Sequence, residues 1–161
     1  QESSNKIIQQ GEIVSFDTDM VGPYGYCADI SRTFVCGNDF NNNQKELYSM
    51  SLEQINHNSN LIKADMSFKE FTEKSWKLPE EYYGNRYSVM VHGIGLCDEW
   101  PSIRYPTDGG DKSGRFLKNM TITVESYIGK VGGKEGVKLE QQYLVGENGL
   151  ELMSHHPLEN I

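Results

Sequence analysis

Two strongly predicted strands joined by a Gly-Gly turn constrain this chain more than any other feature of its sequence. Residues 120–129 (MTITVESYIG) and 136–145 (GVKLEQQYLV) are typical of strands, and Gly132-Gly133 between them is typical of a two-residue hairpin turn. Residues equidistant from such a turn face each other, so Glu125 is predicted opposite Glu140, with Cβ atoms roughly 5 Å apart. Facing glutamates repel each other, so a chain that pairs these strands has to offset that repulsion.

A second set of acids lies in the stretch FDTDMVGPYGYCADISRTF, at positions 16–34. This stretch is predicted as two antiparallel strands joined by a turn at its Gly and Pro residues. If the turn centres on Pro23, Asp17 faces Asp29, whereas a four-residue turn at GPYG would shift the pairing by one position. In either case Asp17 and Asp19 share one face, because side chains alternate along a strand.

Acids on two hairpins are either solvated surface residues or a site that binds cations. Repulsion between two facing sets argues against the first reading, and five carboxylates are too many to share one proton. Two divalent metal ions would nearly neutralise them. His92, in VHGIG at the end of an expected strand, adds an imidazole, although taken alone it is typical of a hydrogen-bonded structural histidine. Oxygen-rich ligands with one imidazole suit manganese, iron, cobalt or zinc.

The remaining elements predict an α+β domain with a mainly antiparallel sheet, because strands, helices and then strands follow one another. The spacing of apolar residues predicts a helix over 44–64. A second helix is expected to begin at Ser67, with Glu70 completing a capping box. A short strand is expected over 87–91, a long ordered loop over 97–119, and a last strand at LELM.

Composition narrows the class of protein. The 161 residues suffice for one domain with a core, and a net charge of −8 without clustered Lys or Arg argues against nucleic acid as a partner. No apolar run approaches the ~20 residues that a membrane helix needs. The three cysteines form no CxxC pair, so free thiols in a reducing compartment, the cytoplasm, are expected.

The order of these motifs resembles the pita-bread metalloenzyme superfamily, which includes methionine aminopeptidases, proline-specific peptidases and creatinase. An Asp strand is followed by DISRTF, HGIG, a strand Glu and KLEQ. The resemblance implies a partial pita-bread fold, in which helices cover a curved, mainly antiparallel sheet, and a site for two divalent metal ions. It also implies that residues 1–161 are the C-terminal part of a catalytic domain whose upstream helix, hairpin and N-terminal domain are missing. The five implied metal ligands are Asp17, Asp29, His92, Glu125 and Glu140.

The chain departs from the peptidases of this superfamily at three places. The peptidases typically carry a second histidine shortly after the ligand histidine, where this chain has Glu99 in HGIGLCDEWP. They carry Glu-Pro-Gly at the first glutamate ligand, where this chain has Glu125-Ser126-Tyr127. Their first strand reads Asp-x-Gly, where this chain has Asp17-Thr18-Asp19. The last change adds an acid beside the expected site.

Together these departures resemble the DddP-type branch of the superfamily, which cleaves dimethylsulfoniopropionate. In that branch the extra acid, here Asp19, joins the metal ligands, and the metal is iron. The resemblance implies two catalytic residues near His92: Tyr87 before it, and Asp98 after it as the base. The other readings are ordinary strand packing for Tyr87 and capping of loop amides for Asp98.

The implied substrate is a small zwitterion with a carboxylate at one end and a dimethylsulfonium at the other. A metal-bound carboxylate has a more acidic α-proton, which a nearby base would remove, and the C–S bond would then break to release dimethyl sulfide and acrylate. The sulfonium would favour aromatic faces. Trp100, Tyr24 and Tyr26 lie near the motifs in sequence and are candidates to bind it, although Trp100 is also typical of a packing residue.

Two other functions fit the same pattern. One is an Xaa-Pro aminopeptidase or dipeptidase that uses a metal-activated hydroxide and needs the second histidine. The other is a non-catalytic binding domain, although such domains usually lose metal ligands and this chain keeps all five family positions. Pairing of subunits is common in the superfamily, so a homodimer is expected. Neither nucleic acid nor a membrane is an expected partner.

Overall fold

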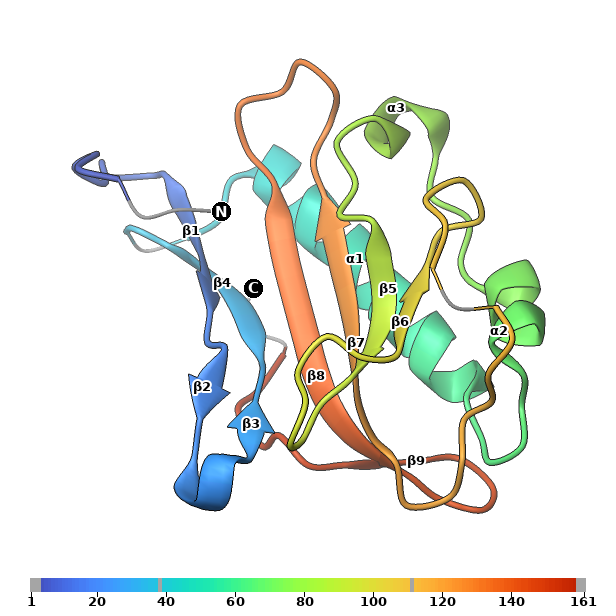
Figure 1. Ribbon diagram of the computed structural model, residues 1–161. Helices are drawn as coiled ribbons and strands as arrows, with labels where there is room; N and C mark the ends of the chain where they lie inside the picture. Colours follow the sequence, from blue (N-terminus) through green and yellow to red (C-terminus); the bar gives the residue numbers. More distant parts are fainter. Residues whose placement is uncertain (1–3, 38, 111, 159–161) are drawn as a thin grey trace.

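The computed structural model describes residues 4–37, 39–110 and 112–158, and it is built around a five-stranded antiparallel sheet (Figure 1). The strand order is β6-β5-β7-β8-β9. The long helix α1 (Asn42–Leu61) runs across one face of this sheet and contacts β7 and β8. The five strands are β5 (Val89–Gly93), β6 (Ser102–Arg104), β7 (Thr121–Ile128), β8 (Val137–Val145) and β9 (Leu150–Leu152).

The N-terminal segment forms a separate two-stranded ribbon that lies beside β8 (Figure 1). In the ribbon, β1 (Ile13–Asp17) pairs with β4 (Ser31–Val35). Beyond this pair, β2 (Met20–Val21) pairs with β3 (Cys27–Ala28). A short 3-10 turn, Pro23–Gly25, closes the tip. The ribbon therefore places its acids next to the second strand of the main hairpin.

The pairing of β7 with β8 confirms the predicted register. Glu125 lies opposite Glu140, and Ile128 lies opposite Val137. The predicted two-residue turn is wrong, because pairing ends at Ile128 and residues 129–136 form a longer loop. The register is nevertheless kept, because this loop stays centred on the two glycines.

The predicted pairing of Asp17 with Asp29 is wrong. Asp17 lies opposite Ser31, so the ribbon turns around Tyr24 rather than around Pro23. Tyr24 has a φ of 63°, a left-handed conformation that non-glycine residues seldom adopt. The turn at Tyr24 shifts the returning strand further along its partner than either of the two pairings considered from the sequence.

Both helices predicted from the sequence begin close to their predicted starts. Helix α2 (Phe68–Lys74) begins as expected, since the Ser67 hydroxyl accepts the Glu70 N–H at 3.1 Å. The predicted capping box is formed only in this half, because the Glu70 carboxylate accepts from Lys74 Nζ at 2.6 Å. Helix α1 begins slightly earlier than expected, because Asn41 and Gln44 form a reciprocal capping box.

The structure adds two short elements that the sequence pattern did not indicate. The predicted loop over 97–119 contains β6, which extends the sheet by pairing with β5. A one-turn helix, α3 (Glu80–Tyr83), precedes β5. None of the helices that the structure describes combines the length and the apolar character needed to span a bilayer.

Apolar side chains gather in two buried clusters that hold the helices on the sheet. One cluster joins α2 to strands β5, β6, β7 and β8, and includes Phe68, Phe71, Met90, Ile103 and Phe116. The other joins α1 to β7 and β8, and includes Leu47, Tyr48, Ile55, Ile128 and Leu139. Because β7 and β8 contribute to both clusters, the strands that carry Glu125 and Glu140 are packed against both parts of the core.

Arg32 joins the ribbon to the sheet and to the C-terminal segment. The residue is only 4% exposed, although it carries a charge on β4. Its guanidinium donates to the side chain of Gln141 and to the carbonyl oxygens of Ser31, Glu140, His156 and Pro157. One side chain thus fixes three separate parts of the chain beside a predicted metal ligand.

Replacing Arg32 by methionine is expected to lower the free energy of unfolding by about 3 kcal/mol or more. The substitution keeps an unbranched apolar stem but leaves several buried acceptors without a donor, each at a cost of roughly 1–3 kcal/mol. Chemical denaturation of the full-length protein measures the loss. The matched control is Arg115→Met, because Arg115 is exposed and, within the part of the chain that the structure describes, its side chain donates to one carbonyl oxygen, Asp65 O. Equal stability of the two variants would contradict the bridging role.

Candidate metal centre

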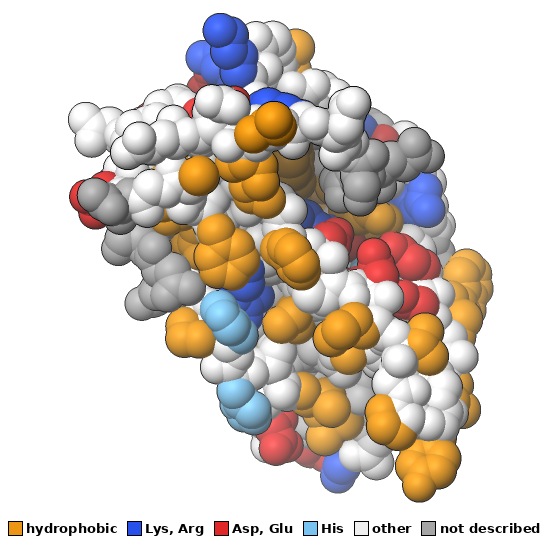
Figure 2. All heavy atoms as spheres, turned by 90° about the vertical axis from the view of Figure 1, so that its left-hand side faces the viewer, with side chains coloured by type: hydrophobic (Ala, Val, Ile, Leu, Met, Phe, Trp, Pro, Cys, Tyr) orange, Lys and Arg blue, Asp and Glu red, His pale blue; other side chains and the backbone are white. Residues whose placement is uncertain are grey.

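A cavity of about 200 Å³ lies where the ribbon meets the main sheet. Figure 2 shows acidic side chains gathered on this face of the molecule, among hydrophobic ones. The cavity brings together residues from β1, β5, β7, β8 and the segments that flank them. Its lining residues are Asp17, Asp19, Asp29, Tyr87, His92, Glu99, Glu125 and Lys138. Glu140 lies directly behind it, within reach of His92.

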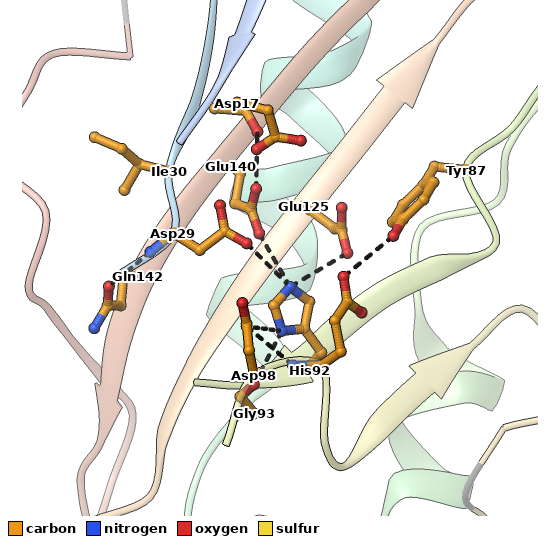
Figure 3. A network of polar contacts seen from close by, with 12 residues as sticks. Asp17, Asp29, Ile30, Tyr87, His92, Gly93, Asp98, Glu125, Glu140 and Gln142 are labelled. Atoms are coloured by element: carbon orange, nitrogen blue, oxygen red, sulfur yellow. Dashed lines mark hydrogen bonds and ion pairs between the residues drawn. The ribbon is translucent and has the colours of Figure 1, made fainter. Parts of the chain in front are cut away.

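His92 is the point on which three carboxylates converge (Figure 3). Its Nε2 lies 3.3 Å from Glu140 Oε1, 3.6 Å from Asp29 Oδ2 and 3.8 Å from Glu125 Oε1. Its Nδ1 lies 3.0 Å from Gly93 O, a contact that assigns the Nδ1 proton to this carbonyl and turns Nε2 toward the acids. All four ionisable residues are at most 3% exposed.

A break in the backbone ladder of the ribbon frees its acids to face the cavity. The β1–β4 pairing ends at Asp17, and the β2–β3 pairing begins only at Met20. Between them, the Thr18 hydroxyl donates to Ile30 O and accepts the Ile30 N–H, both at 3.1 Å. A side chain therefore replaces one rung of the ladder. Asp17 and Asp19, on either side of Thr18, both line the cavity, as their predicted shared face requires.

Ser31 connects the ribbon to the glutamate hairpin. Its hydroxyl lies 2.6 Å from Asp17 Oδ1 and 2.8 Å from Glu140 Oε2. Because Ser31 pairs with Asp17 across the ribbon, the same register that corrects the predicted Asp17–Asp29 pairing positions this link. Asp29 is held separately, by its backbone N–H donating to Gln142 Oε1 at 3.4 Å.

The buried acids of this centre fit a divalent cation. The ligand atoms of Asp29, His92 and Glu140 all lie within 4.8 Å of one another. Among the described residues, the buried carboxylate oxygens without a hydrogen-bond partner are Asp29 Oδ1, Glu125 Oε1 and Glu140 Oε1. A buried carboxylate oxygen without a partner is costly unless a cation offsets its charge. Carboxylates with one imidazole are a suitable ligand set for such an ion.

The pKa values of these groups reflect their burial and their close spacing. Burial, followed by the charge of Glu140, raises the pKa of Asp29 to about 9. Burial likewise raises the pKa of Glu125 to about 8, against the opposing charge of Lys138. For His92, burial acts to lower the pKa, but the close approach of the Glu140 carboxylate and the charge of Glu125 raise it to about 10. A metal ion that binds here would have to displace any protons from these groups, so its affinity is expected to depend on pH.

Lys138 is the main site residue that the sequence reasoning missed. Its side chain is 5% exposed, and its ammonium donates to Glu125 Oε2. The same nitrogen lies 3.6 Å from Glu140 Oε2, 3.8 Å from Asp17 Oδ2 and 4.5 Å from the centre of the Tyr87 ring. Burial acts to lower its pKa, but the charge of Glu125 outweighs this and holds the pKa above its usual range. Strand alternation could have found it, since residues 138 and 140 share one face.

Asp98, the predicted base, lies on the far side of the His92 ring (Figure 3). Its Oδ1 lies 3.8 Å from His92 Nδ1 and accepts the Glu99 N–H at 2.9 Å. Its carboxylate also lies within 4.8 Å of those of Asp19 and Asp29. Asp98 is therefore close to the centre, although it is not among the lining residues of the cavity. It also makes the local amide contact that the alternative reading expects, so its role as base stays a prediction.

The predicted aromatic residues divide into one that lines the cavity and three that do not. The Tyr87 hydroxyl donates to Glu99 Oε1 at 3.3 Å, and burial raises the pKa of Tyr87 well above its usual range. Tyr87 therefore keeps its proton and can act as a hydrogen-bond donor. Trp100, Tyr24 and Tyr26 are 64%, 97% and 56% exposed and lie outside the lining, so their binding of a sulfonium stays a prediction.

Glu99 takes the place where the peptidase pattern has its second histidine. The residue lines the cavity and adopts a left-handed φ of 62°. Of the four histidines of the chain, His92 is the one that lines this cavity. The sequence departure at Glu99 is thus present at the site itself, as an additional acid beside Tyr87.

Comparison with known proteins extends these observations. Residues 1–147 match the model of metallopeptidase family M24. The chain is 38% identical over 163 residues to the dimethylsulfoniopropionate lyase DddP of Roseovarius nubinhibens, covering 99% of this chain and 36% of that protein. It is 33% identical over 157 residues to the Xaa-Pro dipeptidase of Pyrococcus furiosus, covering 94% of this chain and 42% of that protein. The chain thus spans less than half the length of these curated relatives.

Solved structures agree with this relationship. The crystal structure of the X-Pro aminopeptidase from Thermotoga maritima matches with a TM-score of 0.79 at 27% identity, over 98% of this chain and 44% of that one. The fold is accordingly the α+β pita-bread fold expected from the sequence, present in part. The matching family model, the fold and the carboxylate–imidazole centre agree, and the chain belongs to metallopeptidase family M24.

Proposed function

We propose that this chain is the C-terminal part of the catalytic domain of a lyase that cleaves dimethylsulfoniopropionate to dimethyl sulfide and acrylate. The observation that carries the proposal is the 38% identity to the Roseovarius lyase along 99% of the chain, higher than the identity to the Xaa-Pro dipeptidase. The cavity supports it, since Asp19 and Glu99 both line it at positions where the peptidase pattern has other residues.

The centre would hold two divalent metal ions, which we propose to be iron, with manganese, zinc or cobalt as the other candidates. Such ions supply a Lewis acid, which makes the α-proton of a bound carboxylate substrate more acidic. Carboxylate oxygens and one imidazole suit these metals. The residues that would hold the ions are Asp17, Asp19, Asp29, His92, Glu125 and Glu140.

The chain's own residues would carry the proton transfer and bind the substrate. Asp98 would remove the α-proton; the released electron pair forms the carbon–carbon double bond as the C–S bond breaks, so that neutral dimethyl sulfide and acrylate leave. Tyr87, which keeps its proton, would donate a hydrogen bond to the substrate. Glu99 and Asp19 provide negative charge that suits a sulfonium cation.

An Xaa-Pro peptidase is the second candidate, and the structural likeness to the Thermotoga aminopeptidase favours it. That reaction needs a second histidine to assist the peptide carbonyl, whereas Glu99 stands near Tyr87 in this cavity. A homodimer, a small zwitterionic substrate and the absence of nucleic-acid and membrane partners are part of the proposal for the full-length protein.

A paired assay separates the two functions. The full-length protein, loaded anaerobically with Fe(II) and separately with Mn(II), is given dimethylsulfoniopropionate or an Xaa-Pro dipeptide. We expect dimethyl sulfide in the headspace by gas chromatography, with acrylate in equal amount, and no dipeptide cleavage. Dipeptide cleavage without dimethyl sulfide would overturn the lyase assignment. Protein stripped with a chelator serves as the control and is expected to be inactive with both substrates.

A further inference from the structure

Glu99 is an acid of the cavity that the metal centre does not use. It lines the cavity, but it belongs to neither of the two groups of described residues whose atoms could jointly hold an ion. Those groups are Asp29 with His92 and Glu140, and Asp19 with Asp29 and Asp98. A carboxylate that faces the cavity without serving a metal ion is available to the substrate.

The backbone around Glu99 fixes the place of its side chain. The Gly93 N–H donates to Pro101 O at 2.9 Å, which closes the base of the loop that carries Glu99. A side chain at 93 would prevent this closure, because a Cβ there would lie 2.1 Å from Trp100 O. Glu99 itself has a left-handed φ of 62°, and its Oε1 accepts from the Tyr87 hydroxyl at 3.3 Å. These contacts hold the carboxylate at the wall of the cavity, beside Tyr87.

The charges of the centre leave Glu99 unbalanced once two metal ions are bound. Two divalent ions and the buried Lys138 ammonium together match the charge of the five carboxylates proposed as ligands, when these are ionised. Those carboxylates are Asp17, Asp19, Asp29, Glu125 and Glu140. Glu99 and the proposed base Asp98 lie outside this balance, and the Glu99 N–H donates to Asp98 Oδ1 at 2.9 Å. The remaining negative charge is therefore concentrated on one side of the centre.

The aromatic part of the cavity wall suits a cationic substrate less well than Glu99 does. Among the described residues that line the cavity, Tyr87 is the aromatic one, and Lys138 Nζ lies 4.5 Å from the centre of its ring. That ring therefore already contacts a cation of the chain itself. A second cation on the same face would be repelled by the ammonium, whereas the Glu99 carboxylate attracts it.

We propose that Glu99 recognises the positive charge of the substrate, so that the site binds onium carboxylates in preference to uncharged molecules of the same shape. This inference rests on the proposed lyase function and extends its ligand class from sulfonium to quaternary ammonium compounds that carry a carboxylate. Asp98 directly precedes Glu99 in the chain. The proposed base and the residue that recognises the cation thus adjoin each other, as do the carbon that loses the proton and the carbon that bears the sulfonium.

The charge that Glu99 recognises disappears during the reaction. As the C–S bond breaks, its electron pair leaves with the sulfur, and the sulfonium becomes neutral dimethyl sulfide. Glu99 therefore attracts the bound substrate more strongly than the transition state, and such an interaction lowers KM without raising kcat. In Glu99→Gln we expect KM to rise by about five- to tenfold, with kcat unchanged or higher. A fall in kcat with an unchanged KM would contradict this role.

Two ligands that differ in charge but hardly in shape test the inference without turnover. The compound 3-(trimethylammonio)propanoate carries a quaternary nitrogen where 4,4-dimethylpentanoate carries a carbon atom. Isothermal titration calorimetry on the full-length, Mn(II)-loaded protein should give a dissociation constant about five- to tenfold lower for the ammonium compound. Glu99→Gln should lose most of this preference, because it binds the ammonium compound more weakly and the uncharged-end compound equally well.

The controls assign the effect to the charge of one residue. Glutamine keeps the size of the side chain and an oxygen that can accept from the Tyr87 hydroxyl. Elemental analysis should find the same metal content in Glu99→Gln as in the wild type, because Glu99 is in neither group that could hold an ion. Glu147→Gln is the matched control, since Glu147 is exposed, pairs with Lys118 and lies outside the lining of the cavity. This control should keep the full preference.

The outcomes also separate this inference from the lyase assignment. Equal binding of the two ligands by the wild type, an unchanged preference in Glu99→Gln, or loss of metal from that variant would each overturn the role of Glu99. Release of dimethyl sulfide by the same protein would meanwhile leave the lyase assignment standing. A preference that depends on Glu99, in a protein that releases no dimethyl sulfide, would count against the lyase assignment alone.

Discussion

Replacing Glu140 by glutamine is expected to remove bound metal and, with it, lyase activity. Glu140 lies between His92 and Ser31, 3.3 Å from His92 Nε2 through one oxygen and 2.8 Å from the Ser31 hydroxyl through the other. The amide keeps the shape of the side chain but removes its negative charge. Loss of a Lewis acid worth several kcal/mol corresponds to roughly a thousandfold or more in kcat.

Elemental analysis and the dimethyl sulfide assay together measure this effect. The matched control is Glu151→Gln, because Glu151 lies exposed on β9 and pairs with Leu144 of the same strand that carries Glu140. We expect the control to keep metal and activity. Full metal content in Glu140→Gln would show that Glu140 is not a ligand, whatever happens to the activity.

Replacing Asp98 by asparagine is expected to lower kcat by roughly 10²- to 10⁴-fold while metal content stays unchanged. Asparagine cannot accept the α-proton, but its side-chain oxygen can still accept the Glu99 N–H that Asp98 Oδ1 accepts at 2.9 Å. The substitution therefore separates the two readings of this residue. In Asp98→Asn the function of a base would be lost, whereas a cap on the Glu99 amide would be retained.

Comparison with Asp98→Ala makes the distinction sharper. Alanine removes both the base and the cap, so the two variants should be equally inactive if Asp98 is the base. If Asp98 serves only as a cap, Asp98→Asn should stay active and Asp98→Ala should lose thermal stability. Asp65→Asn, at an exposed position with a left-handed φ of 67°, is the control for the substitution itself.

The sequence predicted the glutamate hairpin well because its information is local. A glycine pair between two strand-forming stretches determines which residues face each other, and Glu125 and Glu140 are paired accordingly. The same reasoning gave the wrong register for the ribbon. There Tyr24 adopts a left-handed backbone conformation that its residue type does not predict. Register then depends on the turn geometry, and Ser31 rather than Asp29 lies opposite Asp17.

Features that depend on distant partners were beyond sequence reasoning. Strand β6 is three residues long and forms only because β5 lies beside it, so a loop rich in Gly and Pro gave no sign of it. Nearness in sequence to a lining residue also does not place an aromatic side chain in the lining itself. Trp100 directly follows Glu99, a lining residue, yet its own side chain is 64% exposed. Lys138 was predictable from strand alternation, because residues 138 and 140 share one face of β8.

The hydroxyl of Thr18 has a consequence for how this chain can vary in sequence. It donates a hydrogen bond to Ile30 O and accepts one from the Ile30 N–H, so it replaces both hydrogen-bonding groups of a peptide unit across the gap in the ribbon. Valine would fill nearly the same volume, but it could neither donate nor accept a hydrogen bond. Substitution at this position is therefore limited by hydrogen-bonding capacity rather than by size, and serine is a replacement that can keep both hydrogen bonds between the two aspartates.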